Sequence, residues 1–173
     1  MLVACGDPLP TDTAADAADT ADTAADTADT AADTAPPAWT GSDLSLQDCD
    51  ATPRPLASLV GPAGLVLAVG AAWCGPCQED APVMEAFRAE HPDIGVAQVL
   101  VEGSDAQPIT RLECAEWAES FALGYPVLVD PLFLTEPLVG TDGFPVHVVF
   151  APDGTEVLRA PGAFDGAAVL AAL

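Results

Sequence analysis

Two cysteines separated by two residues are the part of this sequence best suited to chemistry. Cys74 and Cys77 belong to a Trp-Cys-Gly-Pro-Cys motif at residues 73–77, between an apolar run and a segment of helical pattern. A helix that begins at this motif would point unpaired N–H groups and the positive end of its dipole at Cys74. Such groups stabilise a thiolate, the nucleophile in disulfide exchange. We therefore expect Cys74 to be ionised and reachable, and Cys77 to displace the product from a mixed disulfide.

The other residues of the motif suit a groove that binds an extended peptide. Pro76 fits the first turn of a helix, where its missing N–H is not needed. Gly75 lets a substrate chain approach, and Trp73 supplies a flat apolar wall beside the sulfur. We expect all three to lie in the substrate groove.

A Cys-x-x-Cys pair also occurs in zinc sites and structural disulfides. A zinc site would need two further ligands at suitable spacing. Cys49 and Cys114 stand alone, and His91 and His147 form no second pair motif, so we expect no metal. A purely structural bridge within the motif stays open as an alternative.

With Cys5 set aside, the chain has an even number of cysteines, which fits two disulfides in an oxidising compartment. Cys49 and Cys114 are the candidate structural disulfide. The alternatives are two buried free thiols, or a relay that exchanges electrons with the motif. The acids on either side of Cys114 should raise the pKa of its thiol and make it unreactive.

Hydrophobic patterns and turn signals predict the elements that must position the motif. Their order is β-α-β-α-β-β-α: strand 65–71, helix 75–91, strand 94–101, helix 111–123, strand 127–129, hairpin 146–159 and helix 164–173. We expect the apolar side of the first helix to be formed by Val83, Ala86 and Phe87. In the second helix we expect this side to be formed by Leu112, Ala115, Ala118 and Ala122. Periodicity alone predicts an α/β sandwich.

The N-terminal part has a different character. Residues 1–5 end in Leu-Val-Ala-Cys, which resembles a bacterial lipoprotein box; we interpret them as the remnant of a signal, with Cys5 as the lipidated residue. The alternative is an incidental free cysteine. Residues 6–38 are rich in Asp, Thr and Ala and carry no base, which predicts a disordered tether. One folded domain is expected over residues 39–173.

Composition excludes several partners. The formal net charge is -23, with 27 acids, four arginines and no lysine. Nucleic acid is excluded because binding to phosphates requires Lys and Arg, and flat binding to an anionic membrane is disfavoured for the same reason. No apolar stretch approaches the roughly 18 to 20 residues that span a bilayer, so we expect membrane attachment only through the lipid anchor. We expect a monomer.

The motif, with Asp80 and Pro82 after it, resembles thioredoxin-like proteins, most closely the TlpA/ResA-type oxidoreductases of bacterial envelopes, over roughly residues 44–173. The resemblance implies a thioredoxin-like α/β fold, in which a central mixed β-sheet is flanked by helices on both faces. It also implies a cis-proline that faces the active site. Pro145 after Phe144 matches this proline by position, and both belong to the expected groove; Pro126 is the alternative.

The chain departs from the resemblance at the buried aspartate of thioredoxin, whose place is taken by Ala68. The general base is therefore open. Asp80 is a possible proton-transfer group, with Glu79 nearby; the alternative is a solvated acid that the helix dipole favours. We expect His91 to interact with the dipole at the helix end, and His147 to lie on a strand face, with the active-site rim as its alternative.

The resemblance implies an extracytoplasmic, periplasmic thiol-disulfide oxidoreductase that uses no cofactor. Its partners would be protein thiols or disulfides of the envelope and a membrane redox partner. Whether it reduces or oxidises its clients stays open. One alternative is a non-catalytic thioredoxin-fold binding module. Another is a peroxiredoxin-like peroxidase, although the Thr-x-x-Cys motif of that family is missing from the first helix.

Overall fold

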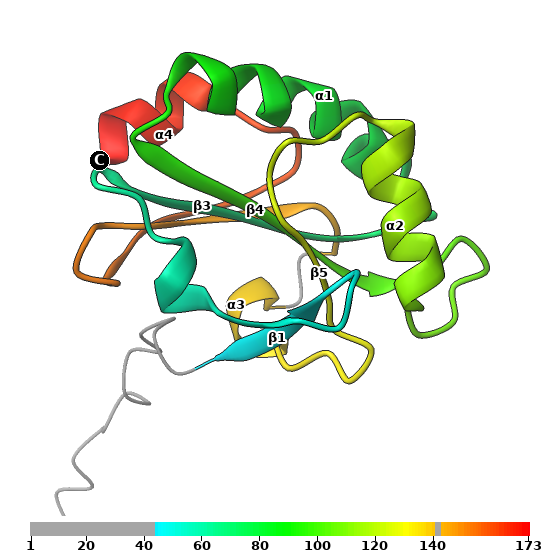
Figure 1. The fold of residues 1–173 in the computed structure, drawn as a ribbon. Coiled ribbons are helices and arrows are strands. Elements are labelled where there is room, and N and C mark those ends of the chain that lie inside the picture. Colours follow the sequence, from blue (N-terminus) through cyan, green and yellow to red (C-terminus); the bar gives the residue numbers. More distant parts are fainter. Residues whose placement is uncertain (1–43, 141–142) are drawn as a thin grey trace, which may run out of the picture. The chain divides into compact units, whose positions relative to one another are not determined.

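A seven-stranded mixed sheet runs through the structure, a computed structural model that describes residues 44–140 and 143–173. The strands lie in the order β2-β1-β5-β4-β3-β6-β7 (Figure 1). Their bounds are β1 (Ser45–Asp48), β2 (Pro53–Pro55), β3 (Gly64–Ala71), β4 (Ile94–Glu102), β5 (Val127–Val129), β6 (Val146–Phe150) and β7 (Glu156–Pro161). The helices are the 3-10 helix η2 (Leu56–Leu59), α1 (Gly75–Glu90), α2 (Arg111–Ser120), α3 (Glu136–Val139) and α4 (Gly166–Ala172).

The centre of the sheet is formed by three parallel strands, β3, β4 and β5. All eight residues of β3 are buried, as expected of an apolar strand covered on both faces. Strand β6 runs antiparallel to β3 and continues into the hairpin with β7. Because β3 and β4 are parallel, their carboxyl ends meet at the same edge of the sheet, where α1 begins.

Helices cover both faces of the sheet, which confirms the predicted α/β class. On one face, the buried side chains of α1, α2 and α4 pack against alternate residues of β3, such as Val66 and Ala68. On the other face, Leu56 of η2 and Leu138 of α3 pack against the intervening residues, such as Leu67. Figure 1 shows α1 and α4 above the sheet and α3 below it.

The predicted elements are confirmed in type and order. Four short elements were not predicted: β1, β2, η2 and α3. Strand β2 consists of Pro53, Arg54 and Pro55, all exposed at the edge of the sheet. Prolines cannot donate to a strand ladder, so such a segment carries no strand signal. The other three elements have four residues each, too few to show a period.

The predicted apolar sides of α1 and α2 are wrong in part. In α1, Val83 is 50% exposed and Ala86 is also exposed. In α2, Leu112 is 70% exposed, Ala115 is exposed and Ala118 is half-buried, and Ala122 beyond its end is exposed. Helix α1 buries Cys77, Asp80, Ala81, Met84 and Phe87, and α2 buries Cys114 and Trp117. These residues recur three or four apart, so the helical period is correct. The error arose because a polar residue and two cysteines take part in the buried faces.

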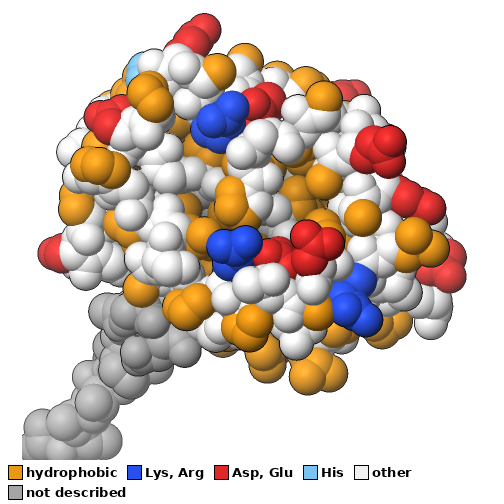
Figure 2. Space-filling model, viewed as in Figure 1, with side chains coloured by type: hydrophobic (Ala, Val, Ile, Leu, Met, Phe, Trp, Pro, Cys, Tyr) orange, Lys and Arg blue, Asp and Glu red, His pale blue; other side chains and the backbone are white. Residues whose placement is uncertain are grey.

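Acidic side chains are spread over the face of the molecule shown in Figure 2 and are not gathered into one patch. Three of the arginines, Arg54, Arg88 and Arg159, form ion pairs with neighbouring acids. Within the described ranges, none of the helices is long and apolar enough to cross a membrane.

Candidate active site

Cys74 is the N-cap residue of α1. Its backbone is extended, with φ -76° and ψ 108°, and its sulfur accepts a hydrogen bond from the backbone N–H of Cys77 at 3.2 Å. Pro76 lies in the first turn, as predicted. A free N–H of the first turn thus points at this sulfur, the arrangement that stabilises a thiolate.

Cys74 and Cys77 are joined in a disulfide, with their Cα atoms 5.2 Å apart. Cys74 is 2% exposed and Cys77 is 1% exposed. The expectation of a reachable Cys74 is therefore wrong for the oxidised form. Gly75 and Pro76, which lie between the two buried cysteines, are exposed.

Trp73 lies beside the disulfide and is 48% exposed. Its indole Nε1 donates a hydrogen bond of 2.6 Å to the Oε2 atom of Glu102. Trp73 follows β3 and Glu102 ends β4, so the two meet because parallel strands bring their carboxyl ends together. Glu102 directly follows the predicted strand 94–101, and no local signal in the sequence marks it as a partner of Trp73.

Phe144 and Pro145 lie directly before β6, the strand that pairs with β3. Val146 at the start of β6 pairs with Val69 of β3, which places Pro145 next to the end of β3. The Phe144-Pro145 peptide bond is the one cis bond found in residues 44–140 and 143–173. The rings of Phe144 and Trp73 are 6.3 Å apart, edge to face.

An apolar pocket adjoins these aromatic residues. It is lined by Val101, Glu102, Pro108, Pro131, Phe133 and Phe144. The rings of Phe133 and Phe144 are 5.9 Å apart. On the side of Gly75 the surface is open, since a Cβ atom there would meet nothing within 4 Å. The pocket is linked to the motif through Trp73, which contacts two of its lining residues, Phe144 and the single carboxylate Glu102.

Asp80 and His147 lie beneath the motif and are both buried, at 7% and 2% exposure. His147 Nε2 and Asp80 Oδ2 are 3.4 Å apart, and Asp80 Oδ1 accepts a hydrogen bond of 3.0 Å from the N–H of Phe164. Burial lowers the pKa of His147, and the negative charge of Asp80 opposes this shift. A solvated Asp80 and a His147 at the rim are both wrong, because α1 turns Asp80 inward onto the strand face that carries His147. Glu79 is exposed.

His91 and Tyr125 make hydrogen bonds that stabilise the fold. His91 is the C-cap of α1, where its N–H donates to the carbonyl of Phe87 at 2.9 Å. Tyr125, before Pro126, is buried, and its hydroxyl donates to the carbonyl of Ala81 at 3.2 Å. Burial and the nearby acids raise the pKa of Tyr125.

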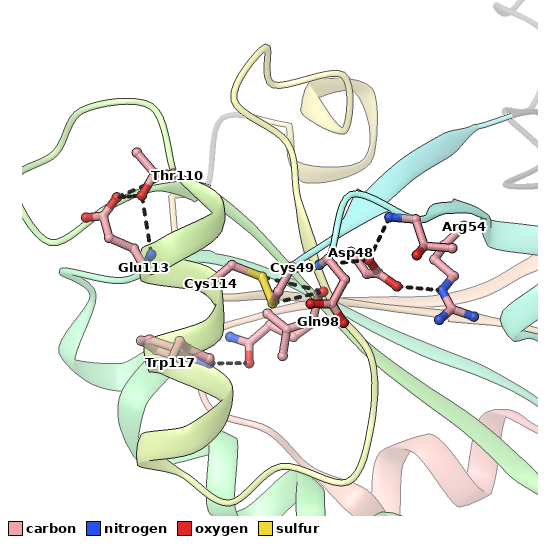
Figure 3. Close-up of a disulfide and its surroundings, with 11 residues drawn as sticks. Asp48, Cys49, Arg54, Gln98, Thr110, Glu113, Cys114 and Trp117 are labelled. Carbon is pink, nitrogen blue, oxygen red and sulfur yellow. Dashed lines mark hydrogen bonds and ion pairs between the residues drawn. A yellow bond between two sulfur atoms is a disulfide. The ribbon is translucent and has the colours of Figure 1, made fainter.

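Cys49 and Cys114 form a second disulfide, which ties the segment after β1 to α2 (Figure 3). Their sulfurs lie 3.7 and 3.6 Å from the carbonyl oxygen of Val127. Next to this bond, Trp117 donates from its indole Nε1 to Gln98 at 3.0 Å. Cys114 is fully buried.

The predicted lipidation residue, Cys5, lies outside the described residues, as do the tether and residues 39–43. Among the residues that the structure describes, no three His, Cys, Asp or Glu side chains gather in a way that could hold a metal ion.

Comparisons with solved structures identify the fold. A protein from Chlorobium tepidum, described as the thiol:disulfide interchange protein DsbE, is 23% identical with a TM-score of 0.64; the match covers 77% of this chain and 94% of that one. The exposed lipoprotein thioredoxin Etrx1 from Streptococcus pneumoniae is 23% identical with a TM-score of 0.60, over 74% and 95% of the two chains. The peroxidoxin BcpB from Mycobacterium tuberculosis is 20% identical with a TM-score of 0.61, over 78% and 90%. The predicted thioredoxin-like fold is thus confirmed.

Sequence comparison is consistent with this fold. No curated protein matches the chain. The AhpC/TSA family matches residues 37–135, which is more than half of the sequence. The match includes β3, the motif, α1 and β4. The chain belongs to the AhpC/TSA family and has the thioredoxin-like fold.

Proposed function

We propose that this protein is an extracytoplasmic thiol-disulfide oxidoreductase whose redox pair is Cys74 and Cys77. The observation that carries the proposal is the hydrogen bond from the first turn of α1 to the Cys74 sulfur. This N–H and the helix dipole stabilise negative charge on Cys74 when the pair is reduced. The similarity to proteins described as a thiol:disulfide interchange protein and a thioredoxin supports the same chemistry.

The reaction proceeds in two exchanges. The thiolate of Cys74 attacks a client disulfide, which forms a bond between Cys74 and one client sulfur and releases the other as a thiolate. Cys77 then loses its proton and attacks the sulfur of Cys74. The mixed disulfide breaks, the second client sulfur leaves as a thiolate, and the Cys74–Cys77 disulfide forms. Two electrons pass to the client, and the reverse sequence oxidises a client dithiol.

The groove beside the disulfide suits an extended client peptide. Trp73 and Phe144 give it apolar walls, and Gly75 and Pro76 are exposed next to the buried Cys74. Backbone groups of Phe144 are available to pair with the client, while Pro145 offers no competing donor. Asp80 is the proposed proton acceptor for Cys77. It lies one helical turn further on the same buried face of α1.

The test combines a trap with a redox titration. We expect Cys77→Ser to accumulate mixed disulfides between Cys74 and client proteins, and Cys74→Ser to accumulate none. Cys49→Ser with Cys114→Ser is the matched control and should still form no trapped complex. Failure of the Cys77→Ser variant to trap any client would favour the binding module over the enzyme.

The titration of the wild-type pair assigns the direction. A potential near about -270 mV, the value for thioredoxin, favours reduction of clients. A potential near about -120 mV, the value for the strong oxidant DsbA, favours oxidation.

The family match and the similarity to BcpB favour a second function, the reduction of peroxides. Here the Cys74 thiolate would attack a peroxide oxygen to give a sulfenic acid and an alcohol or water. Cys77 would then displace water and form the same disulfide. Consumption of hydrogen peroxide by the reduced protein distinguishes the two functions. We expect rates no greater than that of an ordinary thiol, and a rapid rate would assign the protein as a peroxidase.

We further propose that residues 6–38 tether the domain of residues 39–173 to a membrane through lipid on Cys5. The composition of the tether and the lipobox-like residues before it support this arrangement. Periplasmic placement and a membrane redox partner are further parts of this proposal. Mass spectrometry of Cys5, in protein made with its natural leader, tests the anchor: a diacylglyceryl thioether is expected, and an unmodified thiol would remove it.

A further inference from the structure

The face of β3 under α1 has no carboxylate of its own. Its residues on this side are Val66, Ala68 and Gly70, which alternate with residues that face the other core. Gly70 makes room for Cys77, because a Cβ atom at Gly70 would come within 2.7 Å of the Cys77 sulfur. The Cys77 sulfur therefore lies directly on β3, with Ala68 as the next residue on the same side.

The space beside Ala68 is filled from the neighbouring strand. His147 of β6 pairs with Ala68, and it shares its face with Val149, which belongs to the same core as Cys77. Asp80, on the buried face of α1, lies against His147, with its Oδ2 atom 3.4 Å from Nε2 of the ring. Cys77, Asp80 and His147 thus lie along one interior layer between α1 and the sheet.

Several buried polar atoms of this layer lack hydrogen-bond partners among the described residues. Neither ring nitrogen of His147 makes a well-directed hydrogen bond within the described residues, and the same is true of Asp80 Oδ2. Backbone carbonyls of Ala160 and Gly162 are near the ring and favour its protonated form. Buried groups without hydrogen bonds are rare in folded proteins and are expected where they take part in chemistry. We infer that Asp80 and His147 together can take up one proton.

We propose that His147 is the positioning residue that holds Asp80 as the proton acceptor for Cys77. The proposal rests on the redox function proposed above and assigns its proton path. When Cys77 attacks the mixed disulfide, its S–H proton passes to Asp80, where the His147 ring shares the proton. When the Cys74–Cys77 disulfide is next reduced, the proton returns to the Cys77 thiolate.

Few other titratable groups surround the pair. Tyr125 approaches Asp80 from the segment before β5, and Glu85 lies further along α1, paired with Arg88. On β7, Glu156 and Arg159 pair with each other. Asp165 is engaged as the N-cap of α4. Burial lowers the pKa of His147 and so favours the neutral ring, which has a nitrogen free to take up a proton.

Ellman's reagent separates the two steps in the reduced protein with Cys49–Cys114 intact. Cys74 releases one thionitrobenzoate when it attacks the reagent, and Cys77 releases a second when it resolves the mixed disulfide. Stopped-flow absorbance records both rates between pH 5 and 9. We expect His147→Gln to leave the first release unchanged and to slow the second at least about tenfold at pH 7, a modest share of what general bases contribute. Its pH profile should shift toward about 8.5, the pKa of an ordinary thiol.

His91→Gln is the matched control, since His91 is the other histidine of the chain and caps α1 about three turns beyond Asp80. It should keep both rates. A His147→Gln variant whose second release keeps the wild-type rate and pH profile would overturn the inference. If the first release of the wild-type protein shows no lowered pKa, the proposed function itself fails, so the two failures are distinguishable.

A measurement on the wild-type protein guards against a variant that does not fold. NMR titration of the two imidazole rings, in the oxidised and the reduced protein, reports their coupling to Cys77. We expect the midpoint of His147 to move between the two states and that of His91 to stay. Equal midpoints for His147 in both states would contradict the proton path.

Discussion

The two disulfides span similar Cα–Cα distances but have opposite surroundings. Their Cα–Cα distances are 5.4 Å for Cys49–Cys114 and 5.2 Å for Cys74–Cys77. At Cys74 the sulfur faces a backbone N–H, the positive end of a peptide dipole. At Cys49 and Cys114 both sulfurs face the carbonyl oxygen of Val127, the negative end. The first setting stabilises a thiolate and the second opposes it, so the same bond is reactive in one place and inert in the other.

Chain topology separates the two bonds further. Cys49 and Cys114 are 65 residues apart, and Cys74 and Cys77 are three apart. In the chain-entropy model the longer loop stabilises the fold by about 4 kcal/mol and the shorter one by about 1.5 kcal/mol. One bond therefore acts mainly on stability, while the other can open and close without much loss of stability.

Loss of the nucleophile should have the largest effect. We expect Cys74→Ser to reduce turnover of a client disulfide at least about a hundredfold, because it removes the thiolate that the first turn of α1 stabilises. Insulin reduction with dithiothreitol measures it. The double variant Cys49→Ser, Cys114→Ser should keep most of the activity at a temperature where it is folded. An equal loss of activity in the two variants would contradict the assignment of Cys74–Cys77 as the reactive disulfide and Cys49–Cys114 as the inert one.

Stability should respond in the opposite order. We expect Cys49→Ser with Cys114→Ser to lower the free energy of unfolding by about 4 kcal/mol, and Cys74→Ser with Cys77→Ser by about 1.5 kcal/mol. Urea titrations followed by circular dichroism give both values. A larger loss for the second pair would mean that the motif, and not the long-range bond, holds the domain together.

A smaller effect is expected at the groove. Glu102→Ala removes the acceptor that orients Trp73, so kcat/KM for a peptide disulfide should fall about fivefold, the equivalent of roughly 1 kcal/mol for an exposed charge-assisted hydrogen bond. Glu119→Ala, an exposed acid on α2, is the matched control. If both variants behave alike, the effect comes from overall charge and not from Trp73.

The smallest effect is expected at Asp48, the residue directly before Cys49. Burial alone would raise the pKa of Asp48, but hydrogen bonds from the Thr52 N–H and from Arg54 outweigh it and lower this pKa. A lowered pKa means that the ionised carboxylate adds stability above its unfolded value of about 3.9, and that this stability is lost as the pH falls below it. Asp48→Asn should therefore be less stable than the wild type at pH 7 and equally stable near pH 2. A difference that persists at pH 2 would show that the charge is not its cause.

Local signals in the sequence were sufficient to predict the motif and most elements. The apolar strand before Cys74, Pro76 in the first turn and the Asp-Gly turn of the last hairpin each determine their own surroundings. The resemblance to thioredoxin-like proteins then matched Pro145, just before β6, with a proline that faces the active site.

Contacts that depend on strand register could not be predicted in this way. Trp73 meets Glu102 because β3 and β4 end together, and His147 meets Asp80 because β6 pairs with β3 at Ala68. Neither pairing leaves a trace in local spacing. The inward turn of Asp80 was missed for a related reason: an acid near a helix N-terminus is usually solvated, and only the presence of His147 and the Phe164 N–H makes its burial tolerable.

The pH dependence of Cys74 alkylation tests the central claim most directly. The reduced protein, with Cys49–Cys114 intact, is treated with iodoacetamide between pH 4 and 10, and mass spectrometry follows modification of Cys74. We expect a half-maximal rate below about pH 7.5, because the first turn of α1 stabilises the thiolate. A midpoint near about 8.5, that of an ordinary peptide thiol, would contradict the account.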